Sequence, residues 1–381
     1  MTNQPTANKP LRIALVVPHI FLHKEILPHV IFSPGRLAVD LAEGLQVLGA
    51  QVTLFSPGPV ATTVKTVGAD LSYFERELAG RGDSYLDLLK KHPFTFITLA
   101  RQVQAEIIAK AYTAANAGEF DIVHIYTNEE DTALPFAQLC QKPVIFTHHD
   151  PFNFLVKYKN VFPKYQQLNW VSMSLAQRSA MPKGTNWVAN IYHGLKKEAF
   201  AFEPRLTADY VAFMGRLIAP KGAHLAIAAA KQAGVPLKIA GKHYSGAKDS
   251  YWQESISPAL GRGAEYVGFL REQSERQAFL ANARALIVPS TFDEPFGMVV
   301  IEALACGTPV IGMRSGAIPE LIEDGVTGFV VDDEAGIAEA IRRIDAIDRT
   351  ACRKAFERRF TLNRMCQEHA ALYVGLTSLS Q

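Results

Sequence analysis

The chain has few cysteines and no long apolar run. Its 381 residues include only four cysteines, at positions 140, 306, 352 and 366, and no pair of them has C-x-x-C spacing. This scarcity excludes a disulfide scaffold and a zinc ribbon and is typical of a reducing compartment. No apolar run reaches the roughly 18 residues that cross a bilayer, and the polar first ten residues lack the apolar segment of a signal peptide. We therefore expect a cytoplasmic protein.

An excess of charge of either sign is also missing. Lys plus Arg number 39 and Asp plus Glu number 37, which gives a formal net charge of +2. So close a balance produces no field that would make nucleic acid the main partner. With 48% hydrophobic and 20% charged residues the composition is that of a globular protein. A chain of 381 residues exceeds a single core, so we expect two domains.

The apolar pattern alternates between strand-length runs and amphipathic helices. In residues 35–48 leucines recur at spacings of three and four, which predicts a helix that Gly49 ends. The predicted strands are residues 11–17, 51–55, 122–126, 143–147, 210–214, 237–240, 265–267, 285–288 and 309–312, and further helices are expected at 223–233, from 295 onward and at 361–376. Continuous apolar strands that alternate with helices indicate parallel sheets covered on both faces. We expect two such α/β sheets, which meet between residues 191 and 209.

Ligands of open α/β sheets bind beyond the carboxyl ends of the strands. The segments that follow predicted strands are 18–19, 56, 127–129, 148–150, 215–216, 241–242, 268 and 289–294. A G-x-G-x-x-G sequence between a strand and a helix is missing, since the glycines at 261 and 263 lack the third partner. This argues against the alternative of an NAD-dependent oxidoreductase.

Two cations follow the strand at 210–214. Gly215 and Arg216 stand at its carboxyl end, and Lys221 comes five residues later, near the next helix. A guanidinium and an ammonium together neutralise a diphosphate, the first through forked hydrogen bonds and the second as a point charge. The alternative interpretation is two surface cations at a turn.

A loop-to-helix transition follows the strand at 285–288. Pro295 and Gly297 mark it, and the free N–H groups of residues 297–299 predict an anion site. Glu302 falls one turn into the helix, within reach of a ribose hydroxyl pair, and Glu294 precedes the helix. In the alternative interpretation Glu294 caps the helix and Glu302 is a solvated helix residue.

The two carboxylates at 294 and 302 do not suit a glycosidase. Along a continuous helix, eight residues would separate them by ~12 Å. Retaining glycosidases hold their carboxyl groups about 5 Å apart, and inverting ones about 6.5–9.5 Å. Two separate hydrogen-bonding roles on one elongated ligand fit better.

Residues 213–333 resemble the donor half of family 4 retaining glycosyltransferases, the glycosyl transferases group 1. The similarity rests on several motifs in one order: Gly215-Arg216 with Lys221-Gly222, Ala240-Gly241, Tyr266-Val267-Gly268, the pair Glu294 and Glu302 in E-x7-E spacing, the segment 302–310 (EALACGTPV), Pro319-Glu320, and the segment 324–329 (DGVTGF). Each motif alone is weak, but this many in this order are specific. The similarity is weaker in the first half of the chain.

The resemblance implies a GT-B fold, with two Rossmann-like parallel-sheet domains facing a central cleft. Residues 1–193 plus 361–381 would form the N-terminal acceptor-binding domain with a C-terminal crossover helix, and residues 194–360 the nucleotide-sugar-binding domain. By the same likeness Arg216 and Lys221 bind the diphosphate and assist catalysis, Glu302 binds the ribose, and Glu294 binds sugar hydroxyls as a catalytic residue. The remaining donor-binding residues implied are Gly35, Gly215, Val267, Gly268, Phe296, Gly297, Met298 and Val299.

In the first half the resemblance points to two positions. Alignment on Thr147 makes His149 the catalytic histidine beside the donor sugar, and the alternative is a strand-end histidine bonded to a backbone carbonyl. A metal site at His148-His149-Asp150 is not expected, because neighbours in an extended segment point apart. Where relatives have a Gly-Gly pair before the first helix, this chain has Pro34-Gly35, which removes one N–H donor.

The resemblance implies a retaining enzyme that moves a hexose from a nucleotide-sugar to an acceptor hydroxyl. UDP-glucose is the favoured donor and GDP-mannose the alternative, and no cofactor and no metal are expected, in line with the lack of a D-x-D motif at a strand end. A nucleotide-sugar epimerase or a phosphorylase on the same fold stays open as an alternative. The acceptor could be a carbohydrate, a lipid or a small molecule. Basic aromatic stretches at 85–112 and 152–164 leave open a transferase at the inner membrane surface with a lipid acceptor.

Overall fold

The structure is a computed structural model that describes residues 9–30, 32–126, 128–205, 208–243 and 249–379. Position 127, one of the strand-end candidates, and the first eight residues lie outside this set. The chain divides into two compact units. Unit 1 comprises Met1–Met173, Ser179–Ile191 and Met365–Gln381, and unit 2 comprises Ser174–Arg178 and Tyr192–Arg364.

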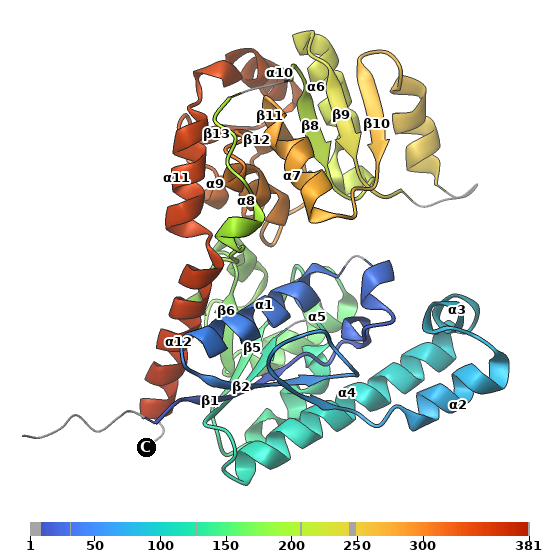
Figure 1. Cartoon of the computed structure of the whole chain (residues 1–381), viewed down its shortest axis with the longest axis vertical. Coiled ribbons are helices and arrows are strands. Elements are labelled where there is room, and N and C mark those ends of the chain that lie inside the picture. Colours follow the sequence, from blue (N-terminus) through green and yellow to red (C-terminus); the bar gives the residue numbers. More distant parts are fainter. Residues whose placement is uncertain (1–8, 31, 127, 206–207, 244–248, 380–381) are drawn as a thin grey trace, which may run out of the picture. The chain divides into compact units, whose positions relative to one another are not determined.

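Unit 1 is built on a seven-stranded parallel sheet in the order β3-β2-β1-β4-β5-β6-β7 (Figure 1). The strands are β1 Arg12–Val16, β2 Gln51–Ser56, β3 Lys65–Gly68, β4 Ile122–Tyr126, β5 Val144–Thr147, β6 Asn169–Ser172 and β7 Trp187–Asn190. The helices are α1 Ser33–Val47, α2 Ser72–Arg81, α3 Tyr85–Lys91, α4 Pro93–Asn116, α5 Val156–Val161 and most of α12 Leu362–Ser378. The first three residues of α12, up to Arg364, belong to unit 2.

Side-chain alternation along β4 shows that this central strand of unit 1 is buried on both faces. Val123 and Ile125 join the core cluster that α4 completes on one face of the sheet. His124 points to the other face, where its ring bonds Tyr373 of α12 at 2.6 Å. Helices therefore cover both faces, and the carboxyl ends of β1, β4 and β5 lie side by side in the sheet order.

Unit 2 is built on a six-stranded sheet in the order β10-β9-β8-β11-β12-β13, and every pairing in it is parallel. The strands are β8 Val211–Met214, β9 Leu237–Ala240, β10 Ala264–Gly268, β11 Ala285–Val288, β12 Val310–Met313 and β13 Gly328–Val331. The helices are α6 Ala223–Ala233, α7 Gln273–Ala281, α8 Met298–Ala305, α9 Ile318–Leu321, α10 Glu334–Arg343 and α11 Arg349–Arg359.

The helices of unit 2 form two packed groups. Helix α10 packs beside α6 and against β12 and β13, and α8 packs against β11 and β12 with α7 and α11 beside it. All four residues of β11 are buried, as expected for a central strand covered on both sides. Among the described residues no helix combines the length and apolar character that crossing a membrane requires.

The predicted helix from residue 295 begins later, at Met298. Gly297 has a φ of +125°, which lies outside the helical region, so the first turn cannot include it. The other predicted elements are present with shifts of one or two residues at their ends, and four of them, 122–126, 223–233, 237–240 and 285–288, have the predicted bounds.

Candidate functional site

The centre of the site in unit 2 is an ion pair between Lys221 and Glu294. The strand β8 ends at Met214, and a short 3₁₀ turn, Ala219–Lys221, then carries Lys221. Its Nζ lies 2.5 Å from Oε1 of Glu294, in the loop after β11. Strands β8 and β11 are neighbours in the sheet, which is why residues 73 positions apart in the sequence meet at its carboxyl edge.

Glu294 is a buried carboxylate with a fixed orientation. Its Oε1 also accepts a hydrogen bond of 2.7 Å from Oγ of Ser290, which is itself buried. Within the described part of the chain, Oε2 has no hydrogen-bond donor. A buried carboxylate is stabilised by such paired donors, and the second oxygen stays available to hydroxyl groups of a ligand.

The alternative interpretation, in which Glu294 caps helix α8, is wrong. The N-cap is Gly297, and no side chain caps this helix. The N–H groups of Met298 and Val299 therefore lack intrahelical acceptors and form the positive end of the helix. Because Glu294 stands in the loop before Met298, the separation of ~12 Å expected for a continuous helix does not apply to the pair Glu294 and Glu302.

The loop that holds Glu294 is fitted to a second loop, after β12. Ala317 donates its N–H to the carbonyl of Glu294 at 2.8 Å, and Ser315 Oγ donates to the carbonyl of Ser290 at 2.9 Å. Between them, Gly316 has a φ of +49°. A Cβ on Gly316 would lie 2.3 Å from the oxygen and 2.4 Å from the nitrogen of the Glu294 backbone. The segment Ser315-Gly316-Ala317 thus positions Glu294.

Arg216 follows β8 directly and is exposed. Its guanidinium makes no ion pair or side-chain hydrogen bond with any residue that the structure describes. Gly215 precedes it and bonds back to the sheet through its N–H and the carbonyl of Ala240, 3.0 Å away. The carbonyl of Gly215 would meet a Cβ on Gly241 at 1.9 Å, so only glycine fits at the end of β9. This close backbone packing leaves Arg216 projecting from a rigid strand end.

Glu302 lies on α8 and is not a solvated helix residue. Its side chain is 14% exposed, and its Oε1 lies 3.8 Å from Nε of Arg276 on α7. Burial raises the pKa of Glu302 to about 7, and the nearby Arg276 opposes that rise. The carboxyl group therefore titrates near neutral pH.

The predicted contacts at the end of β10 lie at the outer edge of the sheet. The pairing of β10 with β9 shifts register between Tyr266 and Gly268, so Val267 bulges there. Gly268 has a φ of +90°, and no heavy atom lies within 4 Å of the position that a Cβ would occupy. Tyr266 donates its hydroxyl to the carbonyl of Gly241 at 2.8 Å. The backbone at 267–268 is thus accessible to a ligand.

An aromatic group beside β10 was not predicted from the sequence. The ring of Trp252 stacks on His243 with 4.2 Å between centroids and an interplanar angle of 9°. Tyr266 meets the same indole at 4.7 Å. His243 is the third residue after β9, so the strand-end rule could have indicated it. Trp252 lies in an irregular helical segment that no motif marks.

Phe296, a predicted donor-binding residue, is a packing residue. Its ring is buried and lies 4.8 Å from the ring of His193 and 6.1 Å from that of Tyr192. The Phe296 side chain thereby holds the loop before α8 in place. The neighbouring residues Gly297, Met298 and Val299 are half-buried at the start of α8.

The two remaining predicted residues, Gly35 and His149, belong to unit 1. Gly35 is buried in the first turn of α1, where a Cβ would lie 2.7 Å from the ring of Phe32. His149 is buried after β5, with its ring 4.6 Å from that of Tyr126. Its neighbour His148 points instead into the aromatic core of unit 1. The described residues contain no group of three or more His, Cys, Asp or Glu side chains arranged as metal ligands.

Comparisons with known proteins relate part of the chain to a family of enzymes. Residues 196–356 match the family model for glycosyl transferases group 1. The D-inositol 3-phosphate glycosyltransferase of Mycobacterium tuberculosis is 35% identical over 166 residues, which are 43% of this chain and 34% of that protein. The match thus spans about a third of the length of that curated relative.

Solved structures resemble the chain over nearly its whole length. AviGT4, a glycosyltransferase involved in avilamycin A biosynthesis, is 21% identical with a TM-score of 0.68 and covers 97% of this chain and 98% of its own. Anabaena HepE, solved with UDP and glucose, is 19% identical with a TM-score of 0.67 and covers 96% and 100%. Together with the two parallel sheets, these likenesses confirm the predicted GT-B fold class.

Proposed function

Because residues 196–356 match the family model for glycosyl transferases group 1, we propose that the protein transfers a hexose from a nucleoside-diphosphate sugar to an acceptor hydroxyl with retention of configuration. The observation that carries this proposal is the Lys221–Glu294 pair at the carboxyl edge of β8 and β11, beside the uncapped start of α8. At this edge of the sheet, the cation and the free N–H groups can bind a diphosphate, and the fixed carboxylate can bind the hydroxyl groups of the attached sugar.

Different residues of unit 2 bind different parts of the nucleotide-sugar donor. Arg216 and Lys221 bind the diphosphate and stabilise the charge that develops on it as the glycosidic bond to the sugar breaks. Glu294 receives sugar hydroxyls on its Oε2, and the half-buried Glu302 receives the ribose hydroxyls. The acceptor hydroxyl attacks from the face that the diphosphate leaves and passes its proton to the departing phosphate oxygen, so no protein nucleophile is needed. His149 stays a candidate catalytic residue of unit 1.

The test of the donor site is a thermal-shift titration with UDP, GDP and ADP, first in EDTA and then with Mg²⁺. A ligand that binds only the folded chain raises its stability with the logarithm of saturation. We expect UDP to give the largest shift, as the HepE complex with UDP suggests, with EDTA making no difference and Arg216→Ala removing the shift. A larger shift with GDP would favour GDP-mannose as the donor. No shift with any diphosphate would contradict the donor-site assignment.

Acceptor-dependent chemistry separates the remaining alternatives. A transferase releases the nucleoside diphosphate only as fast as an acceptor is glycosylated. An epimerase alters the sugar without releasing it, and a phosphorylase requires inorganic phosphate as the second substrate. Nuclear magnetic resonance of the anomeric proton in the product would also report retention or inversion.

Glu302 gives donor binding a specific pH dependence. With a pKa of about 7 in the free protein, its carboxyl group loses the proton as the pH rises from 6 to 8 and becomes a pure acceptor for two hydroxyls. We expect the Kd for UDP to fall over this range by roughly tenfold, about 1.4 kcal/mol, in excess of what the phosphate group of UDP contributes. Calorimetry on Glu302→Gln measures how much of this change in Kd comes from Glu302, because in the variant only the phosphate group of UDP titrates in this range. An identical pH profile for both chains would contradict the assignment.

The orientation of Glu294 requires that residue 316 has no side chain. In Gly316→Ala the new Cβ would collide with the Glu294 backbone, so we expect kcat to fall by tenfold or more, since each 1.4 kcal/mol of lost transition-state stabilisation is a factor of ten. Gly325→Ala is the matched control, because Gly325 has a φ of +73° but nothing within 4 Å of its Cβ position. Gly325→Ala therefore introduces the backbone strain of a positive φ without a collision. Equal activity of the two variants would show that the loop contact has no role.

A lipid surface is a second candidate partner, favoured by exposed apolar side chains in unit 1. Phe94 is 87% exposed at the start of α4, and Val156 is 77% exposed at the start of α5. Exposed lysines stand near them, at Lys90 and Lys159. Flotation with vesicles that contain anionic lipid tests this: Phe94→Ser with Val156→Ser should lower the bound fraction several-fold. An unchanged bound fraction would exclude these side chains as the contact.

A further inference from the structure

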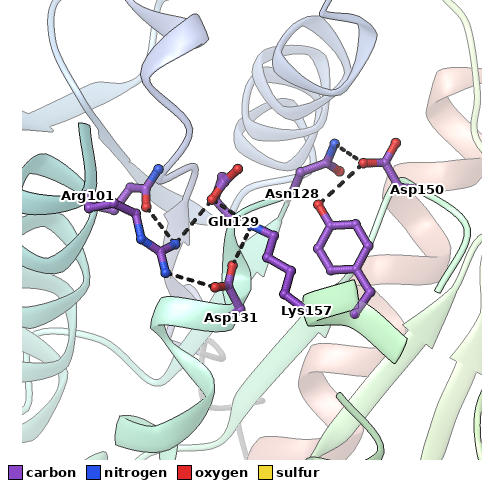
Figure 2. A network of polar contacts seen from close by, with 8 residues as sticks. Arg101, Asn128, Glu129, Asp131, Asp150 and Lys157 are labelled. Carbon is purple, nitrogen blue, oxygen red and sulfur yellow. Dashed lines mark hydrogen bonds and ion pairs between the residues drawn. The ribbon is translucent and has the colours of Figure 1, made fainter. Parts of the chain in front are cut away.

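A closed network of four charged side chains stands in unit 1 (Figure 2). Glu129 and Asp131, in the segment after β4, each contact both cations of the network, Arg101 of α4 and Lys157 of α5. The distances to Arg101 are 3.3 Å and 3.1 Å, and those to Lys157 are 2.9 Å and 3.1 Å. The donor-site assignment uses none of these residues.

The network lies where the sheet of unit 1 would receive a ligand. It follows the carboxyl end of β4, whose neighbours in the sheet are β1 and β5. Asp150, three residues after β5, accepts a hydrogen bond of 2.7 Å from Asn128 in the same segment, as Figure 2 shows. His19 follows β1 and is close enough to Glu129 and Lys157 for both charges to act on it. Open α/β sheets bind their ligands at this edge.

Glu129 is held in a costly backbone conformation. Its φ is +73°, and no other non-glycine residue that the structure describes has a positive φ. The left-handed region costs a residue with a side chain of the order of 1 kcal/mol, and such strain gathers at binding and catalytic sites. The conformation turns the Glu129 carboxylate to both cations at once.

Within the described part of unit 1, the four charged side chains of the network balance one another. Two positive groups, Arg101 and Lys157, oppose two carboxylates, Glu129 and Asp131, so the network sums to zero. Asp150 is a third carboxylate at this edge. Burial lowers the pKa of His19 to about 4, so its ring is neutral at pH 7. An incoming phosphate, with a charge between −1 and −2, would meet two cations that are already paired and three carboxylates.

We infer that the acceptor bound at this edge is an uncharged polyhydroxylated molecule, a sugar or polyol without a phosphate or carboxylate group. This inference rests on the proposed transferase function, which requires an acceptor hydroxyl. A hydroxyl group donates to a carboxylate and accepts from an ammonium or guanidinium, so it joins the network without changing its charge. An anion would compete with Glu129 and Asp131 for the same two cations.

The first experiment compares matched acceptors with the full chain and UDP-glucose. The pairs are glucose with glucose 6-phosphate, myo-inositol with its monophosphate, and glycerol with glycerol 3-phosphate, and release of UDP above the acceptor-free rate is measured. We expect kcat/KM for the neutral member of a productive pair to exceed that of the phosphorylated member by tenfold or more. A preference for the phosphorylated member would overturn the inference.

A second experiment needs no productive acceptor. In chains that carry Arg216→Ala and Lys221→Ala, so that the donor site no longer attracts anions, binding of inorganic phosphate is measured by calorimetry. With the network intact we expect no binding at millimolar phosphate, and adding Glu129→Gln with Asp131→Asn should create it by freeing both cations. Glu77→Gln is the control, because it frees Arg81 from an exposed pair outside the network. Phosphate binding of equal strength with the network intact, or none after the double substitution, would overturn the inference. UDP binding by the unaltered chain tests the proposed function separately.

Discussion

Lys221→Ala should lower kcat/KM for sugar transfer by about 10²–10³-fold, the range found when one preorganised donor to developing charge is removed. Two losses combine in this variant. The diphosphate loses the cation that stabilises it as a leaving group, and the buried carboxylate of Glu294 loses a partner 2.5 Å away. The measurement is the rate of nucleoside diphosphate release with donor and acceptor, together with a thermal melt that shows a folded chain.

The control for Lys221→Ala removes a cation from the same unit without touching the strand-end edge. Arg342 on α10 pairs with Glu339 at 3.2 Å, and both side chains are exposed. Exposed pairs of this kind contribute at most about 1 kcal/mol to stability, so Arg342→Ala should keep nearly full activity. If Lys221→Ala retained the activity of this control, the diphosphate role of Lys221 would be wrong.

Acidification should destabilise unit 1 well before its carboxylates are protonated. Burial among Phe152, Tyr158 and Phe162 lowers the pKa of His148 to about 4, from an ordinary value of 6.5. Burial, aided by His369, also lowers the pKa of His124. Below pH 6.5 the unfolded chain therefore binds more protons at these sites than the folded chain does, and the free energy of unfolding decreases as the pH falls.

The size of the acid effect can be stated for His148. A difference of two to three pH units between the folded and unfolded pKa corresponds to about 3 kcal/mol, present in full above pH 6.5 and lost as the pH falls to about 4. Urea unfolding at pH 7.5, 5.5 and 4.5, followed by tryptophan fluorescence in a chain that carries Trp252→Phe, measures the loss through Trp170 and Trp187 of unit 1. His148→Phe keeps an aromatic ring but cannot titrate, so its stability should fall less. His29→Gln, at an exposed position, should behave as the unaltered chain. A parallel decline in all three chains would contradict the role of His148.

The sequence predicted the parallel sheets because their strands are apolar on both faces. The runs at 122–126 and 285–288 are buried throughout, and the run at 237–240 is buried except at Lys238. Such runs stand out in the sequence as continuous apolar segments. The strands Asn169–Ser172 and Trp187–Asn190 were not predicted, since each is four residues long and carries asparagine at one end. The edge strand Lys65–Gly68 is largely exposed and has no apolar run.

The sequence identified individual residues of the candidate site but not the contacts between them. Motifs in the sequence identified Lys221 and Glu294 separately, yet their ion pair joins positions 73 residues apart and depends on the adjacency of β8 and β11. The support from Ser290 and Gly316 depends in turn on loop packing that no spacing rule describes. The start of α8 was placed too early because the sequence does not reveal that Gly297 adopts a φ of +125°.

The network of unit 1 has no sequence motif at all. Arg101, Glu129 and Lys157 come from three separate elements, and each alone is an ordinary charged residue near a helix or strand end. The positive φ of Glu129 is likewise set by tertiary contacts, since glutamate has no preference for the left-handed region. Only the folded sheet, which brings the ends of β4 and β5 together, reveals the arrangement.

The most direct test of the donor site is hydrogen–deuterium exchange of the full chain with and without UDP. The account predicts slower amide exchange in residues 215–222, 266–268 and 294–302, three segments at or after the carboxyl ends of β8, β10 and β11, and no such protection in Arg216→Ala. Protection confined to other parts of the chain, or the same protection in the variant, would contradict a diphosphate held at this edge of unit 2.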